Sequence, residues 1–194
     1  MTDRFLPRLT LFLAGLLLAA CTTTPQRQSG DGGRREPLVF SVAAVEVVDN
    51  STLPADTDFI TKRRSAELAR RVEAALRQRL RAGGGPGTLR AVIEKAVLTE
   101  RPVETTPGIA GFFLRETEAM LEASLTVRLS ILDEGGFQRA FARVKVERAR
   151  PVPEGTTVAG RDGLARGLAE DLLEQFQEAL EQSVEDNLAA FLQL

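Results

Sequence analysis

The chain has 194 residues, with 25 lysines and arginines against 27 aspartates and glutamates, a net charge of −2. It contains one cysteine and no histidine, tryptophan or tyrosine, which excludes His-dependent catalysis and zinc sites built from His and Cys. Because this composition lacks the usual catalytic groups and a basic excess, we expect no catalytic residue, no metal, no cofactor and no nucleic-acid partner.

The first 20 residues are predicted to be an export signal. Met1–Arg8 carries Arg4 and Arg8 against Asp3, and Leu9–Leu18 is apolar apart from Thr10. A basic start, an apolar run of about 7–15 residues and a small-residue cleavage site are the features of a secretory signal. The run is shorter than the roughly 20 residues that span a bilayer, so we interpret it as a signal and not as a permanent span.

The signal ends in Leu18-Ala19-Ala20-Cys21, which resembles the lipobox of bacterial lipoproteins. The resemblance implies that the thiol of Cys21 receives a diacylglyceryl group, that the chain is cleaved before Cys21 and that the new amine is acylated. Several acyl chains make membrane attachment stable. The alternative is an ordinary signal followed by a buried cysteine.

The residue after the cysteine indicates whether the protein is anchored in the inner or the outer membrane. In the sorting rule of this lipoprotein class, Asp at that position retains the protein in the inner membrane, whereas Thr22 stands here. We therefore expect a protein of the Gram-negative cell envelope that is lipid-anchored in the outer membrane and faces the periplasm.

Residues 21–37 are predicted to be a lipidated flexible tether. The segment 22–37 has no aliphatic side chain and is rich in Thr, Gly, Gln and Arg, so it cannot bury enough surface to offset its ordering entropy. About 16 flexible residues span roughly 20–25 Å. Residues 38–194 are expected to form a single periplasmic domain.

Two strands are predicted in the first half of this domain. Residues 38–48 are mostly apolar on both faces, which favours a central strand. Residues 88–98 place Leu89, Ala91 and Ile93 on one face. The alternation of side chains between the two faces of this second strand is predicted to shift by one residue near Lys95.

A hairpin is predicted in the second half. Residues 119–132 alternate apolar and polar residues over six apolar positions from Leu121 to Ile131, which indicates a strand with one buried face. A tight turn at 133–136 leads to a fourth strand over 137–147. Its buried face is predicted to hold Ala140, Ala142, Val144 and Val146.

Two helices complete the prediction, over 61–82 and 162–192. Thr61 is the expected N-cap of the first helix, and residues 83–87 (GGGPG) end it. Each helix has an apolar stripe: Leu68, Val72, Leu76 and Leu80 in the first, and Leu164, Leu168, Leu172, Phe176, Leu180, Val184, Leu188 and Phe191 in the second. The order β-α-β-β-β-α predicts an α+β fold, a mostly antiparallel sheet with two helices on one face.

The two predicted helices carry opposite charge. Residues 62–81 sum to +6 and residues 162–186 to −7. One interpretation is that the helices lie side by side on the sheet and pair their edges, although exposed pairs each contribute well under about 1 kcal/mol. The other is that the basic helix faces anionic lipid or an acidic partner.

The connection over residues 101–117 is longer than a hairpin needs. It holds an apolar cluster of Ile109, Phe112, Phe113 and Leu114. Such a cluster either folds back under the sheet or is exposed for docking. We treat these four residues as a candidate partner-binding loop.

The element order and the acidic C-terminal helix look like small periplasmic lipoproteins that assist transport across the envelope. Examples are the auxiliary lipoprotein of ABC-type lipid transport systems and the lipoprotein partner of the lipopolysaccharide translocon. This resemblance of pattern covers residues 38–194 and implies a non-catalytic accessory subunit that binds other envelope proteins or lipid. The alternative is a direct binder of a lipid or small amphiphile between the helices and the sheet. An internal cavity would favour the binder, and a solid core with an exposed apolar patch would favour the subunit.

Overall fold

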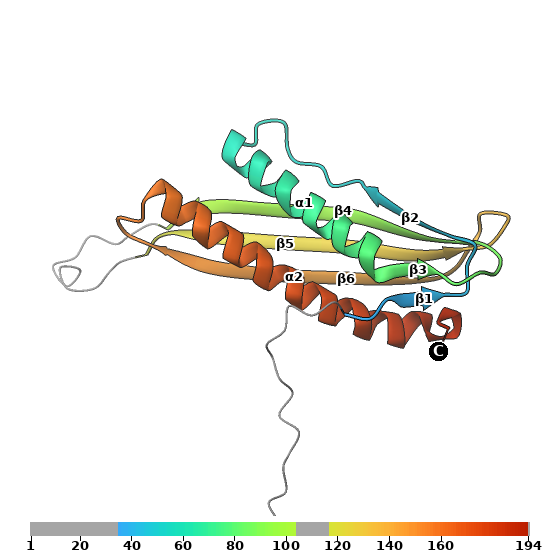
Figure 1. Cartoon of the computed structure of the whole chain (residues 1–194). Helices are drawn as coiled ribbons and strands as arrows, with labels where there is room; N and C mark the ends of the chain where they lie inside the picture. The colour runs from blue at the N-terminus through green and yellow to red at the C-terminus, as the bar shows by residue number, and fades with distance from the viewer. Residues whose placement is uncertain (1–34, 104–116, 194) are drawn as a thin grey trace, which may run out of the picture. The chain divides into compact units, whose positions relative to one another are not determined.

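Two helices lie across one face of a four-stranded sheet in the computed structural model, which describes residues 35–103 and 117–193 (Figure 1). Residues 35–194 form one compact unit. The elements are β1 (Leu38–Phe40), β2 (Ala44–Asp49), α1 (Phe59–Arg79), β3 (Leu80–Ala82), β4 (Thr88–Pro102), β5 (Thr117–Leu132), β6 (Gln138–Pro153), α2 (Val158–Leu188) and the short 3-10 helix η2 (Ala189–Phe191).

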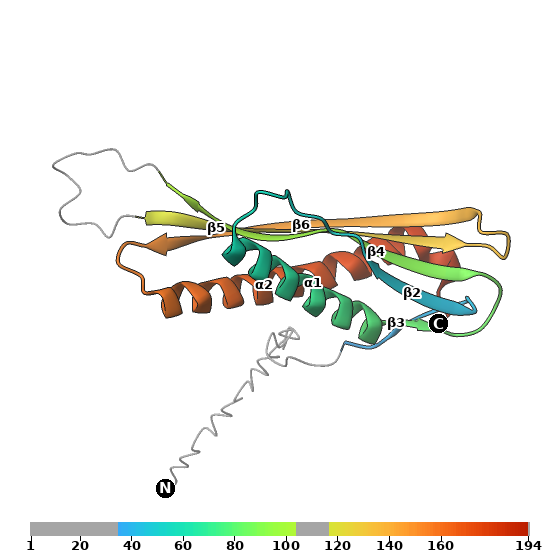
Figure 2. The ribbon, with the colours of Figure 1, turned by 90° about the horizontal axis from the view of Figure 1, so that it is seen from above.

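The sheet has the order β2-β4-β5-β6. Strand β2 runs parallel to β4, and the pairs β4–β5 and β5–β6 are antiparallel. Seen from above, both helices lie on the same side of these strands (Figure 2). The predicted α+β class, the mostly antiparallel sheet and the placement of both helices on one face are confirmed.

Strands β5 and β6 follow the predicted alternation. All six apolar side chains from Leu121 to Ile131 on β5 are buried, and Ala142, Val144 and Val146 of β6 are buried beside them. Ala140 is only partly buried. Full burial of one such aliphatic side chain contributes about 1.5–3 kcal/mol, so this face of the hairpin is a main source of stability.

Strand β4 contains the predicted phase slip. The pairing with β5 shifts between Ile93 and Lys95, which leaves Glu94 as an extra residue. Ala96 and Leu98 are therefore buried on the same face as Ile93, which a strict period of two would not allow.

The predicted strand over 38–48 is wrong in two respects. It breaks at residues 41–43 into β1, which pairs with β3 in a separate two-stranded sheet, and β2, which pairs with β4. The break is stabilised by backbone bonds to other segments, because Ser41 donates to Phe191 and Ala43 donates to Gly87. Strand β2 lies at the edge of the sheet and not at its centre.

Helix α1 differs from its prediction at both ends. It begins at Phe59, and the carboxylate of Asp58 caps it by accepting from the Thr61 N–H at 2.9 Å, so Thr61 is not the N-cap. It ends at Arg79, since residues 80–82 pair with β1 as β3. The predicted stripe is buried. Strand β2 pairs with β4 only as far as Ile93. Further along β4, the buried hydroxyl of Ser65 in α1 accepts a hydrogen bond from the Leu98 N–H at 3.0 Å.

Helix α2 begins four residues earlier than predicted, with Thr157 as its N-cap, and ends at Leu188. Its apolar stripe from Leu168 to Leu188 is buried, while Leu164 and Phe191 are partly buried. After η2 the chain returns to β1, where the Gln193 N–H donates to Val39 at 2.8 Å. The end of the described chain is thus bound to its first strand.

Candidate binding groove

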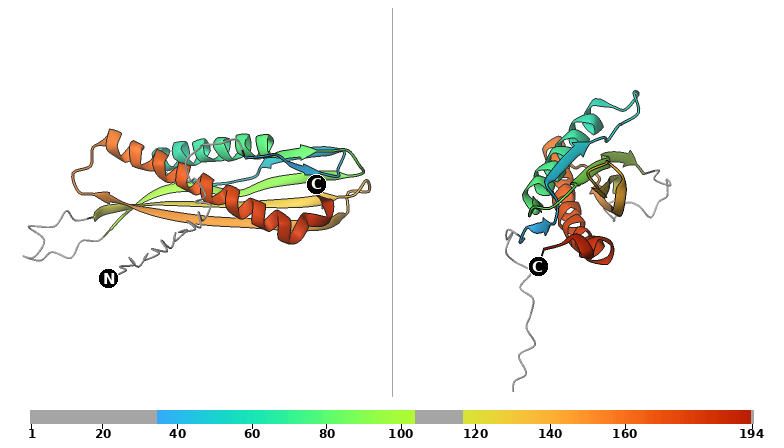
Figure 3. Two further views of the ribbon diagram at one scale, coloured as in Figure 1. Left: turned by 60° about the horizontal axis from the view of Figure 1, so that its bottom comes forward. Right: turned by 90° about the vertical axis from the view of Figure 1, so that its right-hand side faces the viewer.

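The helices run side by side in the same direction (Figures 1 and 3). Ion pairs at successive levels connect them: Arg63 and Arg64 with Asp162, Arg71 with Glu170, and Arg79 with Glu181. The interpretation that oppositely charged helix edges pair on the sheet is therefore confirmed.

A groove of about 400 Å³ lies between the first halves of the two helices. Its floor is apolar and consists of Leu68 of α1, Leu98 of β4, and Ala165 and Ala169 of α2. The two alanines are four residues apart, so they lie on the same face of α2. The buried residues that follow them on α2, Leu172 and Phe176, have larger side chains.

The rim of the groove is basic. Five arginines line it against two carboxylates, a net charge of +3: Arg63, Arg64, Arg70, Arg71 and Arg166 against Glu67 and Asp162. Both carboxylates already accept from arginines, Glu67 from Arg70 and Arg71 and Asp162 from Arg63 and Arg64. Arg71 and Arg64 pair in addition with Glu170 and Glu100, which lie outside the lining, so the surplus positive charge lies mainly on Arg166.

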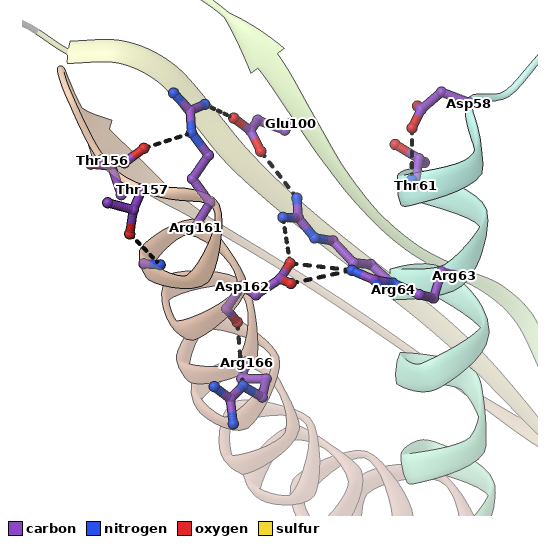
Figure 4. Close-up of polar contacts among 11 residues, drawn as sticks. Asp58, Thr61, Arg63, Arg64, Glu100, Thr156, Thr157, Arg161, Asp162 and Arg166 are labelled. Carbon is purple, nitrogen blue, oxygen red and sulfur yellow. Dashed lines mark hydrogen bonds and ion pairs between the residues drawn. The ribbon is translucent and has the colours of Figure 1, made fainter.

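A network at the N-terminal ends of the helices fixes one end of the groove (Figure 4). Arg64 contacts Asp162 at 2.9 Å and Glu100 of β4 at 3.1 Å. Arg161 of α2 contacts Glu100 as well and reaches Glu118 of β5 at 2.7 Å. Glu100 thus connects both helices to the sheet.

The hydrogen bond from Arg64, and then the charges of Arg64 and Arg63, hold the pKa of Asp162 below its ordinary value, although partial desolvation opposes them. The hydrogen bonds from Arg71 and Arg70 likewise lower the pKa of Glu67. Both carboxylates are therefore ionised at neutral pH, and the net charge of the rim persists.

Two guanidinium groups in the groove have spare donors. The Arg64 side chain is only 9% exposed, and its Nε has no hydrogen-bond partner among the described residues. Arg166 is exposed, and its one side-chain hydrogen bond within the described residues runs from Nε to the Asp162 carbonyl at 3.4 Å. Within residues 35–103 and 117–193, no carboxylate pairs with Arg166.

Both helices begin at the end of the domain where β4 ends (Figures 1 and 3), and exposed apolar side chains occur at these element ends. Phe59 and Ile60 open α1, Val158 opens α2, and Val103 follows β4. Phe59 is 77% exposed and Val158 is 78% exposed. We call these four residues the apolar end.

The residues singled out in the sequence lie outside the described part of the chain. This holds for the lipidation candidate Cys21 and for the loop candidates Ile109, Phe112, Phe113 and Leu114. Sequence reasoning missed the groove, although two signals were present: Ala165 and Ala169 on the inner side of α2, and Arg166 as the one basic residue among the acidic ones of 162–186.

A second, more open hollow of about 790 Å³ lies between the segment 52–58 and β4, and Pro54, Lys95 and Thr99 are part of its lining. Among the helices described, none has the length and apolar character needed to cross a membrane. In the same part of the chain, no group of three or more acidic side chains is placed to hold a metal ion.

No family model and no curated protein matches the chain in sequence. Among solved structures, it is similar to a minor lipoprotein from Acinetobacter baumannii, with 14% identity and a TM-score of 0.39 over 77% of this chain and 95% of that one. It is also similar to rare lipoprotein B from Shewanella oneidensis, with 12% identity and a TM-score of 0.41 over 74% of this chain and 95% of that one. Both proteins are named lipoproteins. Because both TM-scores lie below 0.5, the expectation that this chain is a lipoprotein rests on its own N-terminal residues.

Proposed function

We propose that the chain is a lipid-anchored protein of the bacterial envelope that acts without catalysis as an interaction subunit of a transport or assembly machine. The N-terminal sequence supports the anchor, through Cys21 at the end of a signal-like segment. The observation that carries the interaction role is the apolar end, because four apolar side chains at the starts of the two helices and after β4 are exposed. Exposed apolar residues gathered at one place mark a contact surface.

The position of the apolar end supports the same role. Arg63 and Arg64 connect the start of α1 to Asp162 near the start of α2, so Phe59 and Val158 are presented on elements that the ion-pair network fixes. Strand β4 ends and β5 begins at this end of the sheet, and the predicted loop of Ile109, Phe112, Phe113 and Leu114 belongs to the chain between them, outside the described residues. Aromatic anchors of this kind dominate the energy of many protein interfaces.

Photo-crosslinking in intact cells tests the interaction role. A photoreactive amino acid at position 59 should crosslink one envelope protein, and the variant Phe59→Ser/Val158→Ser of the otherwise native chain should lower partner capture about tenfold or more. The matched control is Phe137→Ser/Phe141→Ser, which removes two exposed phenylalanines from β6 and the turn before it. Equal capture by both double variants, at unchanged melting temperature, would show that the apolar end is not the contact surface.

A second function, direct binding of a lipid or other amphiphile, is favoured by the groove. Ligand sites are typically concave, about 300–1,000 Å³ in volume and mostly apolar, with a few polar groups. The helix groove has about 400 Å³, an apolar floor and charged groups only at its rim. The two functions are compatible, since the groove and the apolar end occupy neighbouring parts of the same helices.

A further inference from the structure

The charges of the groove exceed what helix pairing explains. If the arginines served only to join α1 to α2, each would face a carboxylate on the opposite helix. Arg63, Arg64 and Arg71 do so. Among the residues that the structure describes, Arg70 forms an ion pair only with Glu67 of its own helix, at 2.7 Å, so its charge adds to the rim without connecting the helices.

Arg166 contradicts the pairing explanation most directly. It is the one basic residue of α2 between Asp162 and Asp186, and it lines the groove opposite the basic helix. An acidic side chain would pair better at this position, because like charges across a gap repel. The unpaired Arg166 therefore indicates that a negative charge from outside the protein enters the groove.

Arg64 fixes a positive charge in the wall of the groove. Its side chain is more than nine-tenths buried and lines the groove. It donates to Asp162 at 2.9 Å and to Glu100 at 3.1 Å, and these bonds hold its guanidinium group in place beside the apolar floor.

We propose that the helix groove binds an amphiphile with an anionic headgroup, with the headgroup on the arginines and the apolar chain over Leu68, Leu98, Ala165 and Ala169. This inference rests on the proposed second function and specifies its ligand class. Guanidinium groups bind phosphate and carboxylate oxygens through paired, charge-assisted hydrogen bonds. The apolar floor gives the attached chain a surface that a free anion does not use.

The test is a calorimetric titration of the full chain in phosphatidylcholine nanodiscs, with empty nanodiscs as the blank. The probes are octyl phosphate, octyl glucoside and inorganic phosphate, which separate the charged amphiphile from its chain and its headgroup. Octyl phosphate should bind about tenfold more tightly than either of the others. The variant Arg166→Gln should weaken octyl phosphate binding about tenfold and leave octyl glucoside unchanged.

Two further variants locate the site. Arg81→Gln is the matched control, because Arg81 is also exposed and has no ion pair within residues 35–103 and 117–193, and it should bind like the wild type. Ala169→Leu fills the floor and should remove binding. If Ala169→Leu unfolds the chain, Ala165→Val replaces it.

The possible results separate the failure of the anionic specificity from the failure of amphiphile binding itself. Equal binding of octyl phosphate and octyl glucoside, insensitive to Arg166→Gln, would preserve an amphiphile site and overturn the anionic specificity. Binding of inorganic phosphate as tightly as octyl phosphate would overturn the role of the apolar floor. Unchanged binding by a folded floor variant would place the ligand elsewhere, and no binding of any probe above the blank would remove both the inference and the second function.

Discussion

At the scale of single residues, the two faces of β5 give the sharpest contrast. Val127 is fully buried between Ile93 and Val144, whereas Thr126 on the open face lies in register with Lys95 and Lys145. We predict that Val127→Asp unfolds the domain, because an unpaired buried carboxylate costs several kcal/mol of a total stability of about 5–15 kcal/mol. Thr126→Asp gains two lysine neighbours and should keep the wild-type melting temperature. Equal decreases in melting temperature would show that the assigned faces of β5 are wrong.

A second residue-scale prediction concerns the buried hydroxyl of Ser65. It accepts from the Leu98 N–H at 3.0 Å where β2 no longer covers the edge of β4. Ser65→Ala leaves this N–H without an acceptor and should lower the free energy of unfolding by about 1–3 kcal/mol. Denaturant unfolding measures it, with Ser124→Ala on the open face of β5 as the control. A variant as stable as the wild type would mean that water replaces the hydroxyl.

The sequence predicts single residues well where a strict period fixes their environment. The alternation of β5 identified Val127 as buried, because slipping the phase by one residue would expose all six apolar side chains. The prediction of Thr61 as the N-cap of α1 is wrong, because Asp58 and Thr61 are both good capping residues and the sequence does not distinguish them. The burial of Arg79 could not be predicted, because its partner Glu181 is 102 residues away in the chain.

At the scale of elements, the bulge at Glu94 keeps both halves of β4 in phase. Deleting Glu94 leaves the following residues in strict alternation with Ile93, so Ala96 and Leu98 stay on the buried face without a bulge. We predict that this deletion changes the free energy of unfolding by no more than about 1 kcal/mol, like the control Glu94→Ala, which removes only the 3.1 Å ion pair with Arg143. Deleting Glu94 and Lys95 together turns Ala96 and Leu98 to the open face and should cost about 3 kcal/mol or more. Equal losses for the single and the double deletion in denaturant unfolding would show that the bulge does not set the phase.

The ion pairs between the helices predict a pH dependence. The hydrogen bond from Arg64 lowers the pKa of Asp162 below its ordinary value of 3.8, so the unfolded chain binds this proton more readily than the folded one. The stabilisation is therefore complete above the ordinary pKa and is lost as the pH falls through the lowered one. Asp162→Asn should have a lower melting temperature than the wild type at neutral pH, and the gap should close in acid. A difference in melting temperature that persists in acid would mean that the negative charge of Asp162 is not its cause.

Sequence patterns predict some elements of this fold and not others. Hydrophobic periodicity located both helices and the β5–β6 hairpin, because each buries one face against the sheet. It placed β2 at the centre of the sheet, although an apolar run cannot distinguish a central strand from one that changes sheets at residues 41–43. The groove escaped prediction because it forms between two helices that are distant in sequence, where α2 presents the short side chains of Ala165 and Ala169.

At the scale of the whole molecule, the proposals describe a membrane-anchored domain with two working surfaces, the apolar end for a protein partner and the helix groove for an anionic amphiphile. The composition limits other roles, since a chain without histidine lacks the commonest catalytic acid and base. Both surfaces act at a membrane only if the chain is anchored there. The lipidation of Cys21 is therefore the central claim.

Metabolic labelling of cells with a radioactive fatty acid tests this claim most directly. The full chain is expressed as the wild type, as Cys21→Ala and as the neighbouring control Thr22→Ala, and each is isolated in equal amount. Label should be present in the wild type and in the control and absent from Cys21→Ala, because the thioether needs the thiol of Cys21. Equal label in Cys21→Ala, or a wild type without label, would contradict a lipid anchor at this residue.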